Sequence, residues 1–265
     1  MAGATALKFT VRRRPAVLVS PATQTPRELK RLSDIDDHDR LRFHISIIQF
    51  YGTRESMSGV DPAVVIRDAV AKALVDYYPW AGRLKELEGR KLAVDCSGEG
   101  VLFVEADTDP PFPCLEELIS DVPGSSSILN SPLLIQVTRL ACGGFILASR
   151  MNHMMADGQG LMQFLGAVAE LVRGMPSPTV RPVWQRKLLE ARDPPMPCFP
   201  HREFEEVPDA KGITMPRDKL VCHTFSFEPQ EVDTLRSQLT PDLQKHTTRF
   251  DIVVGLPDSG TFTGP

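Results

Sequence analysis

The sequence has few of the features that mark secreted, metal-binding or membrane proteins. Its 265 residues include only five cysteines, with no Cys-x-x-Cys spacing, so neither a disulfide framework nor a zinc site is indicated. The one dense basic cluster, residues 11–14, precedes an apolar run of four residues that is too short for a signal-peptide core or a membrane span. We therefore expect a cytoplasmic protein with reduced, mostly buried thiols at Cys96, Cys114, Cys142, Cys198 and Cys222.

Nucleotide-binding signatures and a strong charge imbalance are also missing. A dinucleotide-binding loop at Gly98 and Gly100 would need a third glycine where Phe103 stands, and no Gly-Lys-Ser/Thr occurs. The formal net charge of −4 predicts no nucleic-acid partner. An EF-hand starting in the acidic run 33–39 would need glycine and glutamate where Asp39 and Ile45 stand, so we interpret that run as a solvated turn and expect no metal.

Apolar residues make up 42% of the chain, as in an ordinary globular protein. The clearest sequence pattern lies in residues 132–174. Two apolar runs, 133–137 and 145–147, predict strands buried on both faces, with a tight turn at Gly143 and Gly144 between them. Apolar residues then recur every three or four positions from Leu161 to Val172, which predicts a helix that lies on a sheet and stops at Gly174.

The same reasoning predicts further elements on both sides of this stretch. We expect strands at residues 16–20 and 44–51, a helix that begins at Asp61 and Pro62 and stops before Pro79, and a hairpin of strands 92–96 and 101–105. Beyond a proline-rich segment we expect a strand at residues 220–227 and a helix at residues 230–239. A further helix starting near Thr247 is expected to be broken by Gly255, Pro257, Gly260 and Gly264.

His153 and Asp157 stand where the second buried strand gives way to the helix. A side chain at such a junction can point into a crevice beyond the strand end, and an imidazole can accept a proton near neutral pH. The pair alone is weak evidence, because two such residues four positions apart often occur by chance. What strengthens the interpretation is the sequence around them.

Residues 142–164, CGGFILASRMNHMMADGQGLMQF, resemble the BAHD acyl-CoA-dependent acyltransferases of plants, whose signature is His-x-x-x-Asp-Gly after a Gly-Gly-Phe strand. The resemblance continues in residues 19–36, 77–84, 98–107 and 181–186, in the order of the family. Within the family, the likeness is greatest to the alcohol acyltransferase and benzyl alcohol O-benzoyltransferase branch.

The resemblance implies a two-layer α/β fold like that of chloramphenicol acetyltransferase, with a mixed sheet and helices. Residues 1–193 would be the N-terminal acyltransferase domain, residues 194–219 a proline-rich crossover linker, and residues 220–265 the start of a truncated second domain. The second signature of the family, Asp-Phe-Gly-Trp-Gly, is absent from the sequence. In complete members the channel runs between the two domains, so we expect this chain to present at most half of it.

The resemblance also implies transfer of an acyl group from an acyl-CoA thioester to an alcohol, with His153 as the general base. Asp157 would support the motif through an arginine, and Gly158 would let the backbone turn closely into the helix. Acyl-CoA would be a co-substrate, with no permanently bound cofactor, no metal and no membrane partner. Residues that bind coenzyme A are not assigned, the acyl donor and the alcohol are not chosen, and Cys142 is assigned a packing role.

Two other hypotheses remain open. The chain could be a non-catalytic family fragment that binds a partner or acyl-CoA, or a hydrolase in which His153 activates water. In either case an apolar surface left by the truncation could drive self-association.

Overall fold

The structure of the chain is a computed structural model that describes residues 11–108, 118–119, 129–194, 196–200, 202 and 227–258. It divides into two compact units, Met1–Met196 and Pro197–Pro265, which are described separately below. Most of the predicted linker 194–219, the predicted strand 220–227 up to its last residue, and the cysteines at positions 114 and 222 lie outside the described residues.

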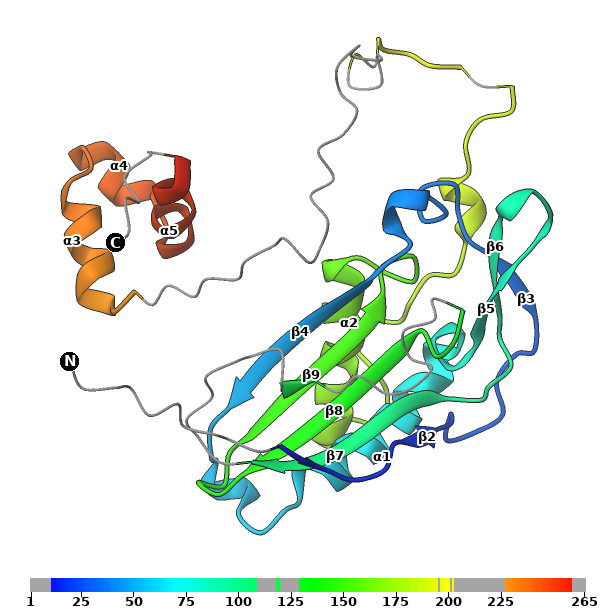
Figure 1. Cartoon of the computed structure of the whole chain (residues 1–265), viewed down its shortest axis with the longest axis horizontal. Coiled ribbons are helices and arrows are strands. Elements are labelled where there is room, and N and C mark those ends of the chain that lie inside the picture. Colours follow the sequence, from blue (N-terminus) through cyan, green and yellow to red (C-terminus); the bar gives the residue numbers. More distant parts are fainter. Residues whose placement is uncertain are drawn as a thin grey trace, which may run out of the picture. The chain divides into compact units, whose positions relative to one another are not determined.

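A mixed six-stranded sheet forms the centre of the first unit (Figure 1). Its strand order is β1-β7-β8-β9-β4, and β2 also pairs with β7. Only β7 and β8 are parallel among these pairs, so the predicted mixed sheet is confirmed. The strands are β1 (Arg12–Arg13), β2 (Val17–Val19), β4 (His44–Tyr51), β7 (Val101–Thr108), β8 (Leu133–Leu140) and β9 (Phe145–Asn152).

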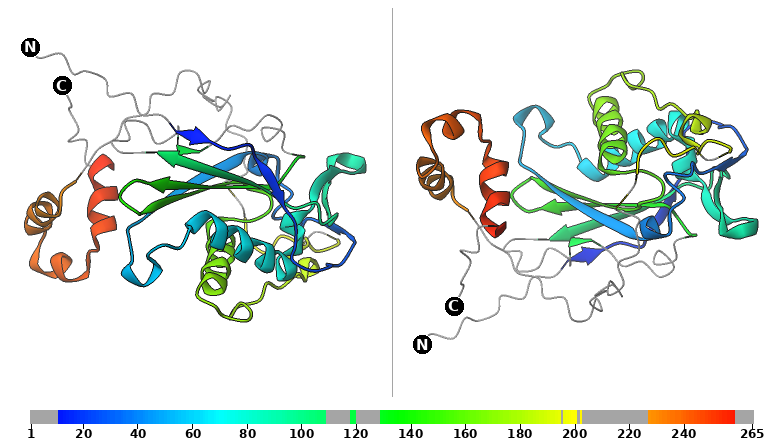
Figure 2. Two further views of the ribbon diagram at one scale, coloured as in Figure 1. Left: turned by 90° about the horizontal axis from the view of Figure 1, so that it is seen from below. Right: turned by 90° about the horizontal axis from the view of Figure 1, so that it is seen from above.

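Two helices, α1 (Pro62–Asp76) and α2 (Gly158–Val172), cover the same face of this sheet (Figure 2). The apolar stripe predicted for α2 is confirmed, since Leu161, Phe164 and Val168 are buried in the main core. On the strands, Ile135 and Val137 pack into that core, whereas Leu134 and Ala148 pack with Ile119 in a separate cluster. Alternate residues of β8 therefore enter different clusters, which confirms that this strand is buried on both faces.

The helix ends follow the predicted residues. The Asp61 side chain accepts a hydrogen bond of 3.0 Å from the Ala63 N–H and caps α1, and Pro62 is the first helical residue. Gly174 follows α2 with φ of +87°, and its N–H donates to the Leu171 carbonyl at 3.0 Å. Because the Met175 N–H also donates to the Glu170 carbonyl at 3.1 Å, α2 ends in a Schellman motif.

The predicted hairpin of residues 92–105 is wrong. Strand β6 (Leu92–Asp95) belongs to a second, antiparallel sheet of order β3-β6-β5, with β3 at Leu29–Arg31 and β5 at Arg83–Glu86, whereas β7 belongs to the main sheet. Gly100 lies between the sheets with φ of +107°, and a Cβ there would collide with the Val19 carbonyl. The glycine therefore directs the chain from one sheet to the other, alongside β2.

Short 3-10 helices connect these elements, and the β8–β9 hairpin turns as predicted at Gly143, whose N–H donates to the Leu140 carbonyl at 2.9 Å. Cys142 lies exposed in that turn, so its predicted packing role is wrong. Elsewhere in the described chain, Cys198 is also exposed and Cys96 is buried. The 3-10 helices are η1 (Asp39–Leu41), η2 (Glu55–Met57), η3 (Tyr78–Ala81), η4 (Glu88–Arg90) and η6 (Arg186–Leu189).

The described part of the second unit consists of three helices, α3 (Pro229–Ser237), α4 (Pro241–His246) and α5 (Arg249–Asp258). Helix α3 confirms the helix predicted at residues 230–239. The expected break at Gly255 and Pro257 is wrong, because α5 continues to Asp258. Gly260 and Gly264, also expected to break the helix, lie outside the described residues. One glycine and one proline lower helix propensity but do not end a helix at a fixed residue.

We expect Gly100→Ala and Gly166→Ala to change stability in opposite directions. Alanine at position 100 would combine a left-handed φ with a backbone clash, so we expect a loss of about 2 kcal/mol or more in the free energy of unfolding. Gly166 lies inside α2, and a Cβ there would meet nothing within 4 Å, so alanine should add about 0.5–1 kcal/mol. Urea denaturation of both variants would measure the change in the free energy of unfolding. Equal changes in the two variants would contradict the claim that the backbone at Gly100 requires glycine.

Candidate functional site

His153 lies in the turn between β9, which ends at Asn152, and α2, which begins at Gly158. Its backbone N–H donates to the Phe43 carbonyl at 2.9 Å, which continues the β4–β9 pairing by one position. The imidazole lies against the Phe43 ring, with ring centroids 5.1 Å apart and planes tilted by 50°. Both the backbone and the ring of His153 are therefore fixed against the residue that precedes β4.

Asn152 shapes the turn that presents His153. It is fully buried, and its N–H donates to the Pro132 carbonyl at 2.9 Å. Its side-chain Oδ1 accepts from the Met154 N–H, and its carbonyl accepts from the Met155 N–H, each at 3.0 Å. Sequence reasoning did not identify Asn152, although an asparagine that bonds the backbone two residues on is a known turn signal.

Asp157 caps α2. Its Oδ1 accepts from the Gly160 N–H at 2.8 Å, and among the described residues it forms no ion pair, so the expected arginine contact is not seen. The close backbone approach expected at Gly158 is not observed either, because a Cβ there would meet nothing within 4 Å. Asp157 thus holds the start of the helix that follows His153.

The His153 imidazole has no fixed hydrogen-bond partner in the part of the chain that the structure describes. Its Nδ1 is buried and unpartnered, so it forms no dyad with Asp157. Serine-protease-like orientation of the histidine by a carboxylate is therefore not a feature of this arrangement. Packing against Phe43, rather than a carboxylate, orients the ring.

A second imidazole, that of His44, lies close to this turn. His44 is the first residue of β4 and pairs with Asn152 across the sheet. Its Nε2 is buried without a hydrogen-bond partner, and burial, with a smaller contribution from the Arg150 charge, lowers its pKa. The sequence showed no partner for His44, because only the strand register brings it beside the residue that precedes His153.

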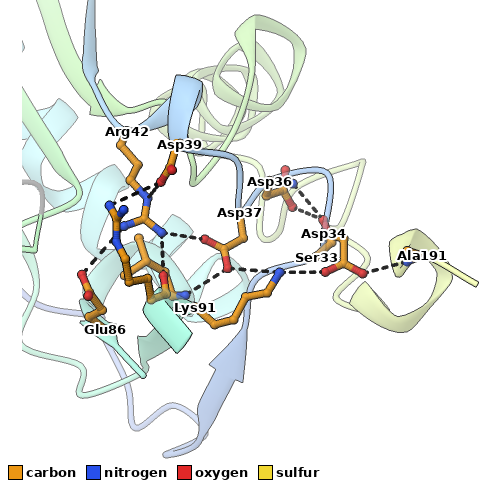
Figure 3. Close-up of polar contacts among 11 residues, drawn as sticks. Ser33, Asp34, Asp36, Asp37, Asp39, Arg42, Glu86, Lys91 and Ala191 are labelled. Atoms are coloured by element: carbon orange, nitrogen blue, oxygen red, sulfur yellow. Dashed lines mark hydrogen bonds and ion pairs between the residues drawn. The ribbon is translucent and has the colours of Figure 1, made fainter. Parts of the chain in front are cut away.

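The acidic run 33–39 forms an ion-pair network next to this site (Figure 3). The Asp37 side chain is only 2% exposed, and it accepts from Arg42 Nη2 at 3.3 Å and from the Leu92 N–H at 3.1 Å. Arg42 Nη2 also donates to the Arg90 carbonyl at 2.6 Å. The run is a turn, as predicted, and Asp34, Ile35, His38 and Asp39 are exposed. The Asp37 carboxylate is the exception, because Arg42, five residues on, and the Leu92 N–H, 55 residues on, remove it from water.

The same run holds the chain that leaves α2. The Arg186 guanidinium pairs with Asp36 at 2.7 Å. Asp34 pairs with Lys91 at 3.0 Å and accepts from the Ala191 N–H at 2.8 Å, and these two contacts hold the pKa of Asp34 below its usual value. Because Arg42 directly precedes Phe43, the network also fixes the backbone that receives the His153 hydrogen bond.

Among the described residues, no group of three or more His, Cys, Asp or Glu side chains is placed to hold a metal ion. Within the same residues, no helix is long and apolar enough to cross a membrane.

The mixed sheet, with two helices on one face and a histidine turn at the end of β9, defines an α/β protein of the CoA-dependent acyltransferase fold. The chain belongs to the Transferase family, the BAHD acyltransferases that the sequence resembles; the family matches residues 7–256. The predicted family and fold class are thus confirmed.

Several plant enzymes are similar to this chain over nearly its whole length. It is 54% identical to benzyl alcohol O-benzoyltransferase of Petunia hybrida, covering 93% of this chain and 56% of that protein. It is 50% identical to (Z)-3-hexen-1-ol acetyltransferase of Arabidopsis thaliana, covering 93% of this chain and 57% of that protein. The predicted branch agrees with these relatives, and the chain spans a little more than half of their length.

The crystal structure of vinorine synthase has a similar fold. The two superimpose with a TM-score of 0.61 at 26% sequence identity, over 92% of this chain and 58% of that one.

We expect Asp37→Asn to destabilise the first unit far more than Asp34→Asn. Loss of the Asp37 charge leaves Arg42 and Lys91 without a buried partner, which should lower the free energy of unfolding by about 2 kcal/mol or more. Asp34 is 43% exposed, so its variant should lose less than about 1 kcal/mol. Chemical denaturation of both variants would measure the two losses in the free energy of unfolding. Equal losses would contradict the claim that the buried Asp37 carboxylate stabilises the first unit.

His44 should make the first unit sensitive to acid. Its folded-state pKa is lowered, so the folded state favours the neutral imidazole, and stability is lost as the pH falls from about 6.5 through the folded pKa. We expect His44→Gln to lose less stability than the unmodified chain between pH 7.5 and pH 5.5, as measured by urea denaturation. An unchanged pH dependence in the variant would contradict this account.

Proposed function

We propose that this chain carries half of an acyltransferase site in which His153 removes the proton from an alcohol that attacks an acyl-CoA thioester. The observation that carries the proposal is the placement of His153: its backbone is fixed by Phe43, and its imidazole makes no hydrogen bond within the described chain. The relatives support it, because their names specify acyl transfer to benzyl alcohol and to (Z)-3-hexen-1-ol.

The reaction needs one proton carrier. The alcohol oxygen attacks the thioester carbonyl carbon while the imidazole takes the hydroxyl proton. The tetrahedral intermediate then expels the coenzyme A sulfur, which takes up the proton from the imidazolium, and the ester is released. Histidine suits both steps because it gains and loses a proton near neutral pH.

The other motif residues have supporting roles in this proposal. Asp157 caps α2 and so holds the end of the His153 turn, while Gly158 starts the helix. Acyl-CoA is the co-substrate and a small alcohol the acceptor, with no permanently bound cofactor. Residues 1–193 form the acyltransferase domain, 194–219 the crossover, and 220–265 the start of a second domain.

The test is the release of free thiol from acetyl-CoA and benzoyl-CoA, with and without benzyl alcohol or (Z)-3-hexen-1-ol. We expect alcohol-dependent release that falls at least about 100-fold in His153→Ala, since a general base contributes about that factor or more. His246→Ala is the matched control, because His246 is exposed in α4 of the second unit.

Three outcomes would count against the proposal. Release that persists in His153→Ala would place the chemistry elsewhere. Equal release with and without alcohol would support hydrolysis. No release from a chain shown to be folded by circular dichroism would support the alternative, a family fragment that at most binds a ligand or partner.

A further inference from the structure

A pocket lies at the end of the main sheet farthest from His153. It forms where β4 ends at Tyr51, where the β8–β9 hairpin turns, and where α1 begins and α2 ends. His153 follows the last residue of β9 at the opposite end. Phe145, which lines the pocket, is eight residues before His153, and at about 3.4 Å per residue the two lie roughly 27 Å apart.

The pocket has the size and the interior of a small-molecule site. Its volume is about 890 Å³, and binding clefts for small ligands usually measure about 300–1,000 Å³. The Tyr51 and Phe145 rings stack at 4.7 Å and also line it. Much of the remaining apolar surface comes from core side chains and from the loop before α1, including Ile66, Leu147, Leu165, Val168, Met57 and Val60.

The loop of residues 52–60 leaves the pocket open. A Cβ on Gly52 or on Gly59 would meet nothing within 4 Å, so a side chain at either position would point into open space. The start of the loop does pack, because Gly52 and Thr53 lie against the turn at Gly143 and Gly144. The facing wall is fixed, because Arg139 on β8 donates to both carboxylate oxygens of Asp61, the cap of α1, at 2.7 and 2.6 Å. The Arg139–Asp61 pair thus fixes one side of the pocket.

The charged groups of the pocket favour an anion. Arg139 is neutralised by Asp61 and by Glu105, which it contacts at 2.6 Å. Arg54 and Arg173 also line the pocket, are exposed, and form no ion pair within the described chain. Only one acid in the lining, Glu55, is likewise without an ion-pair partner there. Two free cations face one free carboxylate.

We propose that this pocket binds a small carboxylic acid with an apolar body, such as a medium-chain fatty acid or an aromatic acid. The apolar body lies on the core side chains of the floor and on the stacked rings of Tyr51 and Phe145. The carboxylate lies toward Arg54 and Arg173, where the charge is complementary. This site is separate from His153 and does not depend on the acyltransferase proposal.

Isothermal titration of the full chain with octanoate and, separately, with 1-octanol tests the proposal. We expect octanoate to bind and the uncharged alcohol to bind more weakly. Ala169→Trp would fill the pocket from α2 and should lower octanoate affinity about tenfold or more, because it displaces the apolar part of the ligand. Met162→Trp is the matched control, since Met162 is exposed on the same helix and does not line the pocket.

The charge contribution has its own pair of variants. Arg173→Ala should weaken octanoate binding about threefold to fivefold, as expected for an exposed ion pair, while Arg173→Lys should retain it. Binding in Ala169→Trp equal to that of the unmodified chain would overturn the proposed site. Equal affinity for octanoate and 1-octanol, with Arg173→Ala unchanged, would overturn the proposed carboxylate.

Discussion

The antiparallel pairing of β4 with β9 is the interaction on which the proposed site depends. The pairing begins at Phe145 opposite Tyr51 and runs to Asn152 opposite His44, and the hydrogen bond from the His153 N–H to the Phe43 carbonyl extends it by one residue. The histidine is therefore the last position fixed by the sheet before the chain turns into α2. Any shift in register would move it away from Phe43.

The ion-pair network at residues 33–42 supports that pairing from outside the sheet. Asp37 brings Arg42 to the start of β6, and the residue after Arg42 is the one that accepts the His153 hydrogen bond. Asp36 and Asp34 hold the chain that leaves α2 in the same place. The cost of removing Asp37 from water is offset by three partners. The turn before β4 is therefore held by these polar contacts together with Leu32 and Leu41, which pack in or against the main core.

Much of the fold could be predicted from local patterns. Apolar runs predicted β8 and β9, three-and-four spacing predicted α2, and capping residues predicted where α1 begins and α2 ends. Long-range pairing could not be predicted this way. Residues 92–105 look like a hairpin, but their strands join different sheets. The acidic run forms the expected turn, but its contacts with Leu92 and Arg186 come from residues distant in sequence. The position of His153 followed from the strand-to-helix pattern, and Asn152 has the local signal of an asparagine turn. The place of His44 beside them depends on the strand register.

The most direct test is amide hydrogen exchange of the 265-residue chain, followed by NMR or mass spectrometry at single-residue resolution. The account predicts that the His153 amide is protected to the same degree as the amides of β9 that pair with β4, because the same ladder holds it. An unprotected His153 amide beside a protected β9 would contradict the account, since the histidine would then not be fixed by the sheet.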